Sequence, residues 1–138
     1  MSARQRPAAF LDTNVLVYAL GDDRARTPVA EALLEQGGVI SVQVLNELAA
    51  VAHRKLCMSW EDVAEVVAAM RELCPAPRPI TCALHEHALA LAARDGYTIY
   101  DALIVAAALD AGCTTLYSED MQDGRVVDDR LTIRNPFR

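Results

Sequence analysis

The sequence predicts a three-layer α/β/α fold, in which a parallel sheet of short strands is covered by helices on both faces. Short apolar runs alternate with longer segments whose apolar residues recur at helical spacing. Strands separated by helices are typical of right-handed crossovers, which make the strands parallel. The chain has 138 residues, of which 53% are hydrophobic, and this fits a single domain over residues 1–138 with a substantial core.

The predicted strands are short apolar runs followed by turn or cap residues. The first is residues 8–11, which ends at Asp12, and the last is residues 131–133, before Asn135 and Pro136. Between them we expect strands at residues 39–40, at Ile80 and at residues 114–117.

The predicted helices are delimited by caps and glycines. The first covers residues 15–20 and stops at Gly21. Thr27, followed by Pro28, is expected to cap a second helix that ends at Gly37 and Gly38. Ser41, Ser59 and Thr81 are expected to cap three more.

Two of the predicted helices carry acidic residues that are candidates for a functional site. The Ser41-capped helix contains Glu47, and its apolar face is expected to consist of Leu45, Leu48, Ala52 and Leu56. A later helix, led by Asp101 and ending at Gly112, is apolar on nearly every face, so we expect it to be buried.

The charge of the chain limits the classes of function. The formal net charge is −6 and the isoelectric point is near 4.9. This argues against a protein that holds nucleic acid by a basic surface alone. A phosphate-containing substrate would therefore need a bridging cation.

Composition also predicts the cellular setting. No run reaches the roughly 18 apolar residues of a membrane span, and the N-terminus lacks a secretory apolar segment, so we expect a soluble, cytoplasmic protein with no membrane partner. The cysteines Cys57, Cys74, Cys82 and Cys113 show no C-x-x-C spacing, and we expect buried, reduced thiols rather than a zinc site.

Four acidic residues stand at strand ends or in helices near the same predicted edge of the sheet: Asp12, Glu47, Asp101 and Asp120. Ligands of open parallel sheets bind beyond the carboxyl ends of the strands. Two carboxylates about 4 Å apart repel by roughly 4 kcal/mol at an effective dielectric near 20, so a cluster of four requires a cation. Oxygen ligands favour Mg²⁺ or Mn²⁺, which is typical of a phosphodiester hydrolase.

Each acid taken alone has a purely structural interpretation. Asp12 and Asp101 could be helix N-caps. Glu47 could face solvent on its helix, and Asp120 could belong to a solvated loop. His85 and His87 are two residues apart, which places them on different sides of a helix and disfavours a shared metal.

The four acids and their neighbours resemble the motifs of the PIN-domain family, specifically the VapC-type toxin ribonucleases of type II toxin–antitoxin systems. The matching segments occur in order along almost the whole chain: Leu11-Asp12-Thr13-Asn14, Asn46-Glu47, Tyr100-Asp101-Ala102 and Ser118-Glu119-Asp120. Together they are far more specific than any one alone.

The resemblance implies an endoribonuclease that depends on Mg²⁺ or Mn²⁺ and uses a metal-activated water. The four acids match the catalytic and metal-binding quartet, Thr13 and Asn14 match polar positions beside the first acid, and Ser118 matches the hydroxyl residue before the last one. Asp123 is an extra acid that could hold a second metal. The resemblance also implies a homodimer and a small antitoxin partner. The basic residues Arg24, Arg26, Arg54 and Lys55 could contact RNA phosphates or form a solvated surface.

Three alternatives remain open. An RNA-processing nuclease of the same family would act without an antitoxin, and a non-catalytic module would bind RNA or protein through the same fold. A phosphatase with Asp12 as nucleophile would usually carry a second acid two residues later, where Asn14 stands.

Overall fold

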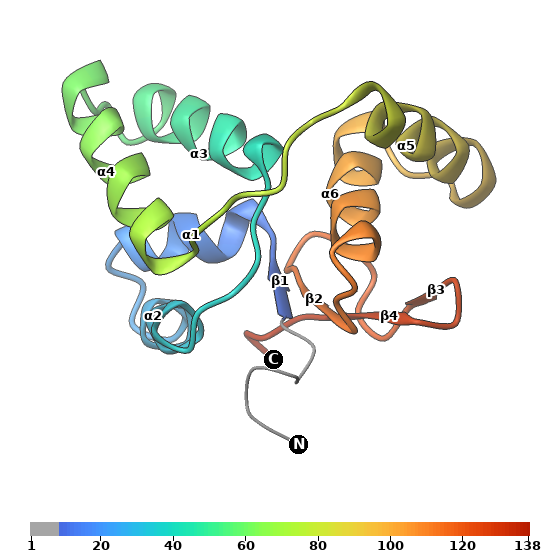
Figure 1. Ribbon diagram of the computed structural model, residues 1–138. Helices are drawn as coiled ribbons and strands as arrows, with labels where there is room; N and C mark the ends of the chain where they lie inside the picture. The colour runs from blue at the N-terminus through green and yellow to red at the C-terminus, as the bar shows by residue number, and fades with distance from the viewer. Residues whose placement is uncertain (1–8) are drawn as a thin grey trace.

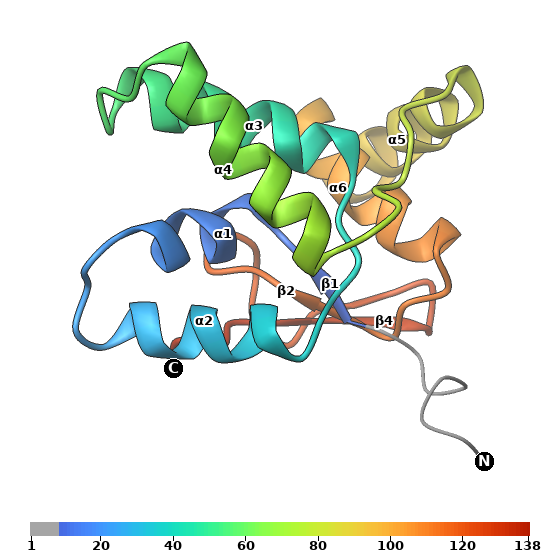
Figure 2. The same ribbon diagram turned by 60° about the vertical axis from the view of Figure 1, so that its left-hand side comes forward.

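The computed structural model describes residues 9–138, and at its centre lies a four-stranded sheet with the order β1-β2-β4-β3 (Figures 1 and 2). Strands β1 (Ala9–Leu11), β2 (Thr115–Tyr117) and β4 (Leu131–Arg134) are parallel, as the alternation of strands and helices predicted. The short edge strand β3 (Val126–Val127) is antiparallel to β4 and was not predicted, so the sheet is mixed. Two residues give too weak a pattern to indicate a strand.

Six helices lie around this sheet in the part of the chain that the structure describes. In Figure 1, α1 to α4 lie on one side of β1, and α5 and α6 lie on the other. Their bounds are α1 (Thr13–Leu20), α2 (Arg26–Glu35), α3 (Val42–Arg54), α4 (Trp60–Leu73), α5 (Cys82–Asp95) and α6 (Ile99–Asp110). This arrangement agrees with the predicted three layers. Within the described residues, no helix has the length and apolar content needed to cross a membrane.

Two of the predicted strands do not form as strands. The one at residues 39–40 is present as an isolated bridge, and the one at Ile80 is absent. Val39 forms a single parallel bridge beside β1, where the Leu11 N–H donates to the Val39 carbonyl at 3.0 Å. The prediction of a strand at Ile80 is wrong, because the chain pairs two residues earlier, through a bridge between Ser41 and Arg78. Proline at positions 75, 77 and 79 has no N–H to donate, which keeps this pairing short. Residue 8 of the first predicted strand lies outside the described residues.

The predicted caps were correct for three helices and wrong for one. The hydroxyls of Ser41, Ser59 and Thr81 each accept the backbone N–H three residues later. Helix α2 instead begins at Arg26, and the carboxylate of Asp23 accepts the N–H groups at its start. The Thr27 hydroxyl donates to the Tyr18 carbonyl at 2.7 Å and thereby ties α2 to the end of α1.

Helix α6 forms the centre of the core, and every residue from 102 to 109 is buried. Its cap is Thr98, whose hydroxyl accepts the Asp101 N–H at 3.1 Å. Asp101 is therefore in the first turn of the helix and is not its cap, contrary to one sequence interpretation. A carboxylate in the first turn is favoured by the helix dipole.

The cysteine prediction was half right. All four thiols are free, and Cys74 and Cys113 are buried, but Cys57 and Cys82 are exposed. Cys57 and Leu56 both follow the end of α3. Leu56 is 43% exposed, so it does not belong to the apolar face that the sequence predicted for this helix. Because α3 ends at Arg54, the helical spacing no longer applies to these two residues.

Candidate active site

The site forms where β1 and β2 end side by side. Asp12 follows β1, and its N–H donates to the Tyr117 carbonyl at the end of β2 at 3.0 Å. Since the two strands are parallel, the loop after β2, which carries Ser118 and Asp120, lies at the same edge of the sheet. Two segments about a hundred residues apart in sequence therefore meet here.

Asp12 is held by three donors. The Thr13 N–H reaches its Oδ1 at 2.7 Å, the Ser118 hydroxyl reaches Oδ2 at 2.7 Å, and the Asn14 amide reaches Oδ2 at 3.4 Å. Asp12 is the N-cap of α1, so the structural interpretation of this residue is correct. A cap uses one carboxylate oxygen lone pair, so this role leaves Asp12 free to bind a cation as well.

Burial dominates the electrostatics of Asp12. Its side chain is 4% exposed, and this burial raises its pKa to about 7, with smaller contributions from the negative charges of Glu47 and Asp101. The hydrogen bonds from Ser118 and Thr13 oppose the increase but do not cancel it. The ionised carboxylate is thus costly in this position, and a bound cation would relieve that cost.

Glu47 faces the site rather than bulk solvent. Its two oxygens accept from the Thr13 hydroxyl and from the Gln43 amide, each at 2.9 Å. The interpretation of Glu47 as a solvent-facing residue is therefore wrong. Gln43 was missed in the sequence, although its position one turn before Glu47 on α3 was the available signal.

Asp101 approaches the same place from α6. Burial, followed by the charges of Glu47 and Asp120, raises its pKa. Among the described residues, no side chain donates a hydrogen bond to its carboxylate, in contrast to Asp12 and Glu47. Asp101 is the acid of the site with the least support from its neighbours.

Ser118 and Asn14 connect Asp120 to the rest of the site. The Ser118 oxygen, fully buried, accepts the N–H groups of Asp120 and Met121 while its hydroxyl donates to Asp12. The Asn14 amide lies 3.2 Å from Asp120 Oδ2, and the Asn14 carbonyl oxygen accepts the Glu119 N–H. The loop after β2 is therefore fixed to the start of α1, while the Asp120 side chain itself is exposed.

Asp123 is engaged elsewhere. Its Oδ1 accepts the Asn135 N–H at 2.9 Å, and its Oδ2 lies 3.9 Å from the Arg138 guanidinium. These contacts fasten the C-terminal segment. A metal role for Asp123 remains a prediction.

One wall of the site was not predicted from the sequence. Glu119 accepts from the Tyr18 hydroxyl at 2.6 Å and from Arg26 Nε at 2.8 Å. Burial works against ionisation of Glu119, but these hydrogen bonds and the Arg26 charge outweigh it and lower its pKa. Arg26 also pairs with Asp23, so its charge is already balanced within the protein, which weakens its candidacy as a phosphate contact.

The donor set fits a hard divalent cation. All four acids supply carboxylate oxygens, and three of them interact electrostatically with one another. Within residues 9–138, however, no three acidic, histidine or cysteine side chains are already placed to hold one metal ion. Sharing a cation would therefore require at least one carboxylate to rotate toward the others.

A groove leads away from these acids between α1 and α3. Its volume is about 440 Å³. Its lining includes Glu47, Asp120 and Lys55, the last of which is the C-cap of α3. Val17, Ala50 and Val51 contribute apolar side chains to the lining.

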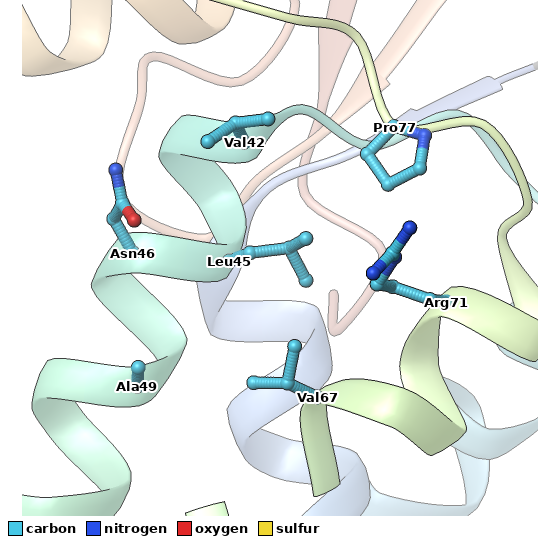
Figure 3. A pocket seen from close by; sticks show the side chains of 7 residues that line it. All are labelled: Val42, Leu45, Asn46, Ala49, Val67, Arg71 and Pro77. Carbon is cyan, nitrogen blue, oxygen red and sulfur yellow. The ribbon is translucent and has the colours of Figure 1, made fainter. Parts of the chain in front are cut away.

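A second groove, of about 460 Å³, lies between α3 and α4 (Figure 3). Its lining contains no carboxylate, and Arg71 is its one charged residue among those that the structure describes. Asn46, which precedes Glu47, lines this groove and not the acidic one. The two residues of the Asn46-Glu47 motif thus contribute to different surfaces.

Comparison with known proteins agrees with this geometry. Residues 9–126 match the PIN domain family. The fold is similar to the crystal structure of Mycobacterium tuberculosis VapC20, a toxin that cleaves the sarcin–ricin loop, with a TM-score of 0.67 and 25% sequence identity over 82% of this chain and 90% of that one. None of the curated proteins matches the sequence. The match covers most of the chain, including Asp12, Glu47, Asp101 and Asp120, and the chain belongs to the PIN-domain family.

Proposed function

We propose that this protein is a metal-dependent endoribonuclease and the toxin of a toxin–antitoxin pair. The observation that carries the proposal is the buried carboxylate of Asp12, held by three donors and flanked by the charges of Glu47 and Asp101. A site that fixes repelling carboxylates together serves no evident purpose without a cation. The similarity to VapC20, a toxin that cleaves the sarcin–ricin loop, supports RNA as the substrate class.

The four acids would hold Mg²⁺ or Mn²⁺, with Asp12 as the fixed ligand. When bound, such an ion lowers the pKa of a coordinated water and neutralises charge on the phosphate. Ser118 and Thr13 keep the Asp12 carboxylate oriented, and the Thr13 hydroxyl also orients Glu47. Asn14 positions the loop that carries Asp120.

Charge also argues for a cation in RNA binding. A protein with a net charge of −6 repels RNA, and the acids at the site add to that repulsion. A divalent ion held by these acids would offset part of their charge and would supply a positive centre for a phosphate oxygen. The electrostatics therefore link metal binding and substrate binding.

The test is cleavage of a mixed RNA substrate by the purified protein with Mn²⁺, with Mg²⁺ and with EDTA, alongside Asp12→Asn. We expect cleavage with metal, none with EDTA, and little with the variant. Arg130→Ala, in the turn between β3 and β4, is a control for preparation and folding and should cleave like wild type. Equal cleavage in EDTA, or full activity of Asp12→Asn, would exclude the proposed mechanism.

Metal binding has a second, independent readout. An ion that binds only the folded protein raises its thermal stability, so millimolar Mg²⁺ or Mn²⁺ should raise the melting temperature of wild type. The same addition should shift Asp12→Asn much less. No shift of wild type at millimolar metal would argue against the site.

The proposal includes a small antitoxin, a homodimer and a cytoplasmic location, as expected of VapC-type toxins. An antitoxin-like reading frame beside the gene would favour the toxin over an RNA-processing nuclease. A non-catalytic binding module is disfavoured because four acids would weaken RNA binding without contributing to it. Trapping a phospho-aspartate at Asp12 would instead support a phosphatase.

A further inference from the structure

We propose that Tyr18 and Arg26 are positioning residues for Asp120, and that they act through the carboxylate of Glu119. The inference rests on the proposed function, because it concerns how one of the four metal-binding acids is held. Tyr18 lies near the end of α1, and Arg26 is the first residue of α2. These two helices pack against each other (Figure 2). Glu119 directly precedes Asp120 in the loop after β2, so the network joins both helices to the residue beside the acid.

Asp120 has little support of its own. Its side chain is exposed, and among the described residues its one hydrogen-bond donor is the Asn14 amide, at 3.2 Å. The hydrogen bonds of the backbone around it are also long, since the N–H groups of Asp120 and Met121 lie 3.2 and 3.3 Å from the Ser118 hydroxyl oxygen. The position of Asp120 therefore depends on the residues on either side of it.

Glu119 provides the firmer anchor on one side. Its Oε1 accepts from the Tyr18 hydroxyl at 2.6 Å, and its Oε2 accepts from Arg26 Nε at 2.8 Å. Hydrogen bonds to an ionised group at such distances are roughly twice as strong as neutral ones. On the other side of Asp120, the side chain of Met121 is buried. The backbone of Asp120 is thus fixed between two anchored residues, while its carboxylate can still rotate toward a cation.

The two donors to Glu119 are themselves held in place. Asp23 accepts the N–H groups at the start of α2, and its Oδ2 lies 3.3 Å from the Arg26 guanidinium. The guanidinium carbon of Arg26 lies 5.3 Å from the centre of the Tyr18 ring. Phe137 contacts the same ring edge-on, with centroids 4.9 Å apart. Side chains that are locked by packing and further hydrogen bonds hold a functional group more precisely than one isolated contact does.

These contacts set Glu119 apart from the four metal-binding acids. Both of its oxygens already accept hydrogen bonds, and the Arg26 guanidinium pairs with its charge. A paired carboxylate adds less repulsion to the neighbouring acids than a bare one would. Binding a metal through Glu119 would break both hydrogen bonds, so the geometry favours a supporting role over that of a fifth ligand.

The network also borders the groove that contains the acids. Tyr18, Glu119 and Asp120 line the same 440 Å³ groove as Glu47. A substrate in this groove could touch Tyr18 directly, so a cleavage assay alone would not separate such a contact from the positioning of Asp120. Measurements without RNA make that separation.

The first measurement is the backbone hydrogen exchange of the Asp120 and Met121 N–H groups, followed by NMR in EDTA. Tyr18→Phe keeps the ring and removes only the hydroxyl, and Arg26→Ala removes the second donor to Glu119. In each variant, exchange of both N–H groups should be about tenfold faster than in wild type, as expected for loss of a hydrogen bond to a charged group. Wild-type exchange rates in both variants would overturn the inference.

Arg94→Ala is the matched control. Arg94 also pairs with two carboxylates, those of Asp95 and Asp128, and none of the four acids of the site is among its hydrogen-bond or ion-pair partners in the described residues. This variant should leave the exchange of both N–H groups unchanged. Thermal melts in EDTA should show every variant folded, because partly exposed ion pairs contribute little to global stability.

The second measurement is the dissociation constant for Mn²⁺, determined by calorimetry without RNA. Glu119→Ala should raise this constant about tenfold, the lower end of what loss of an outer supporting group costs, and Tyr18→Phe should raise it by a smaller factor. If Tyr18 acts through Glu119, adding Tyr18→Phe to Glu119→Ala should cause no further change. A full additional effect of Tyr18→Phe in that background would contradict the route through Glu119.

Cleavage assays then distinguish failure of this inference from failure of the nuclease assignment. Loss of positioning should raise the Mn²⁺ concentration needed for half-maximal cleavage, with the rate at saturating Mn²⁺ within about threefold of wild type. If wild type cleaves RNA and the variants match it in exchange and Mn²⁺ binding, the positioning network is wrong and the nuclease stands. If the variants differ in exchange and Mn²⁺ binding but wild type shows no metal-dependent cleavage, the network stands and the nuclease fails.

Discussion

The two halves of the acidic site differ in how their carboxylates are supported. Asp12 and Glu47 together accept five hydrogen bonds, from Thr13, Asn14, Ser118 and Gln43. Asp101 accepts none from a side chain among the described residues, and Asp120 accepts one, from Asn14 at 3.2 Å. One half is fixed by the protein, and the other is free to adjust.

This difference suggests that the two halves of the site have different roles in metal binding. The fixed half places an anion with little reorganisation, which is what a preorganised site requires. The adjustable half can rotate to complete the coordination, consistent with the finding that no three ligands within residues 9–138 are already arranged around one ion.

Loss of either a fixed or an adjustable acid should abolish most activity. Asp12→Asn and Asp101→Asn are each expected to lower RNA cleavage at least about 10²-fold, comparable to the loss of one electrostatic stabiliser. Initial rates in Mn²⁺ measure this. Circular dichroism should show both variants folded. Activity of Asp101→Asn within a few fold of wild type would mean that the adjustable half is dispensable.

The pH dependence of stability should distinguish the two acids. With a folded-state pKa of about 7 and an ordinary value of 3.8, Asp12 binds more protons in the folded state between these pH values. Stability therefore falls as pH rises through this window in EDTA, by up to about 1.4 kcal/mol per pH unit and on the order of 4 kcal/mol in all. The pKa of Asp101 is raised too, and it adds to the same trend.

The measurement is urea unfolding in EDTA at several pH values between 4 and 8. Wild type should lose stability toward pH 8, and Asp12→Asn should lose most of that dependence. Asp101→Asn should lose a smaller part, because its carboxylate is only half-buried. Added Mg²⁺ should oppose the loss at pH 8, since the ion favours the ionised carboxylates. Equal effects of the two substitutions would contradict the contrast between fixed and adjustable halves.

Ser118→Ala tests the support of the fixed half directly. The substitution removes a donor to buried Asp12 and the acceptor for the N–H groups of Asp120 and Met121. We expect about 1 to 3 kcal/mol lower stability and roughly tenfold lower cleavage. Thr81→Ala is the matched control, because it removes a cap far from the site at a cost of about 1 kcal/mol and should leave cleavage unchanged. Wild-type cleavage by Ser118→Ala would show that Asp12 needs no such support.

Much of this fold and site could be predicted from the sequence, because the signals are local. The apolar run before Asp12, the caps Ser41, Ser59 and Thr81, and the apolar helix beginning near Asp101 are patterns of neighbouring residues. The parallel order of the strands then follows from their connections. These local patterns and the parallel strand order were enough to predict that Asp12 and Asp120 lie at the same edge of the sheet.

The partners of the acids could not be predicted in the same way. Gln43 and Glu119 are polar residues that occur as often on plain surfaces, and only tertiary packing brings Glu119 to Tyr18 and Arg26. Thr27 carried a cap signal, but a hydrogen bond to the Tyr18 carbonyl in another helix overrode it. Long-range hydrogen bonds leave no periodicity in the sequence, so these details required the structure.

Asp123 is an acid that lies outside both halves of the site. Its carboxylate accepts the Asn135 N–H and lies near Arg138, which assigns it to the C-terminal segment. Asp123→Ala should therefore lower stability by about 1 kcal/mol, the usual contribution of one such hydrogen bond, and leave cleavage within about twofold of wild type. The measurements are urea unfolding and initial rates over a range of Mn²⁺ concentrations. A loss of cleavage that excess Mn²⁺ restores would instead place Asp123 at a second metal and extend the adjustable half to include it.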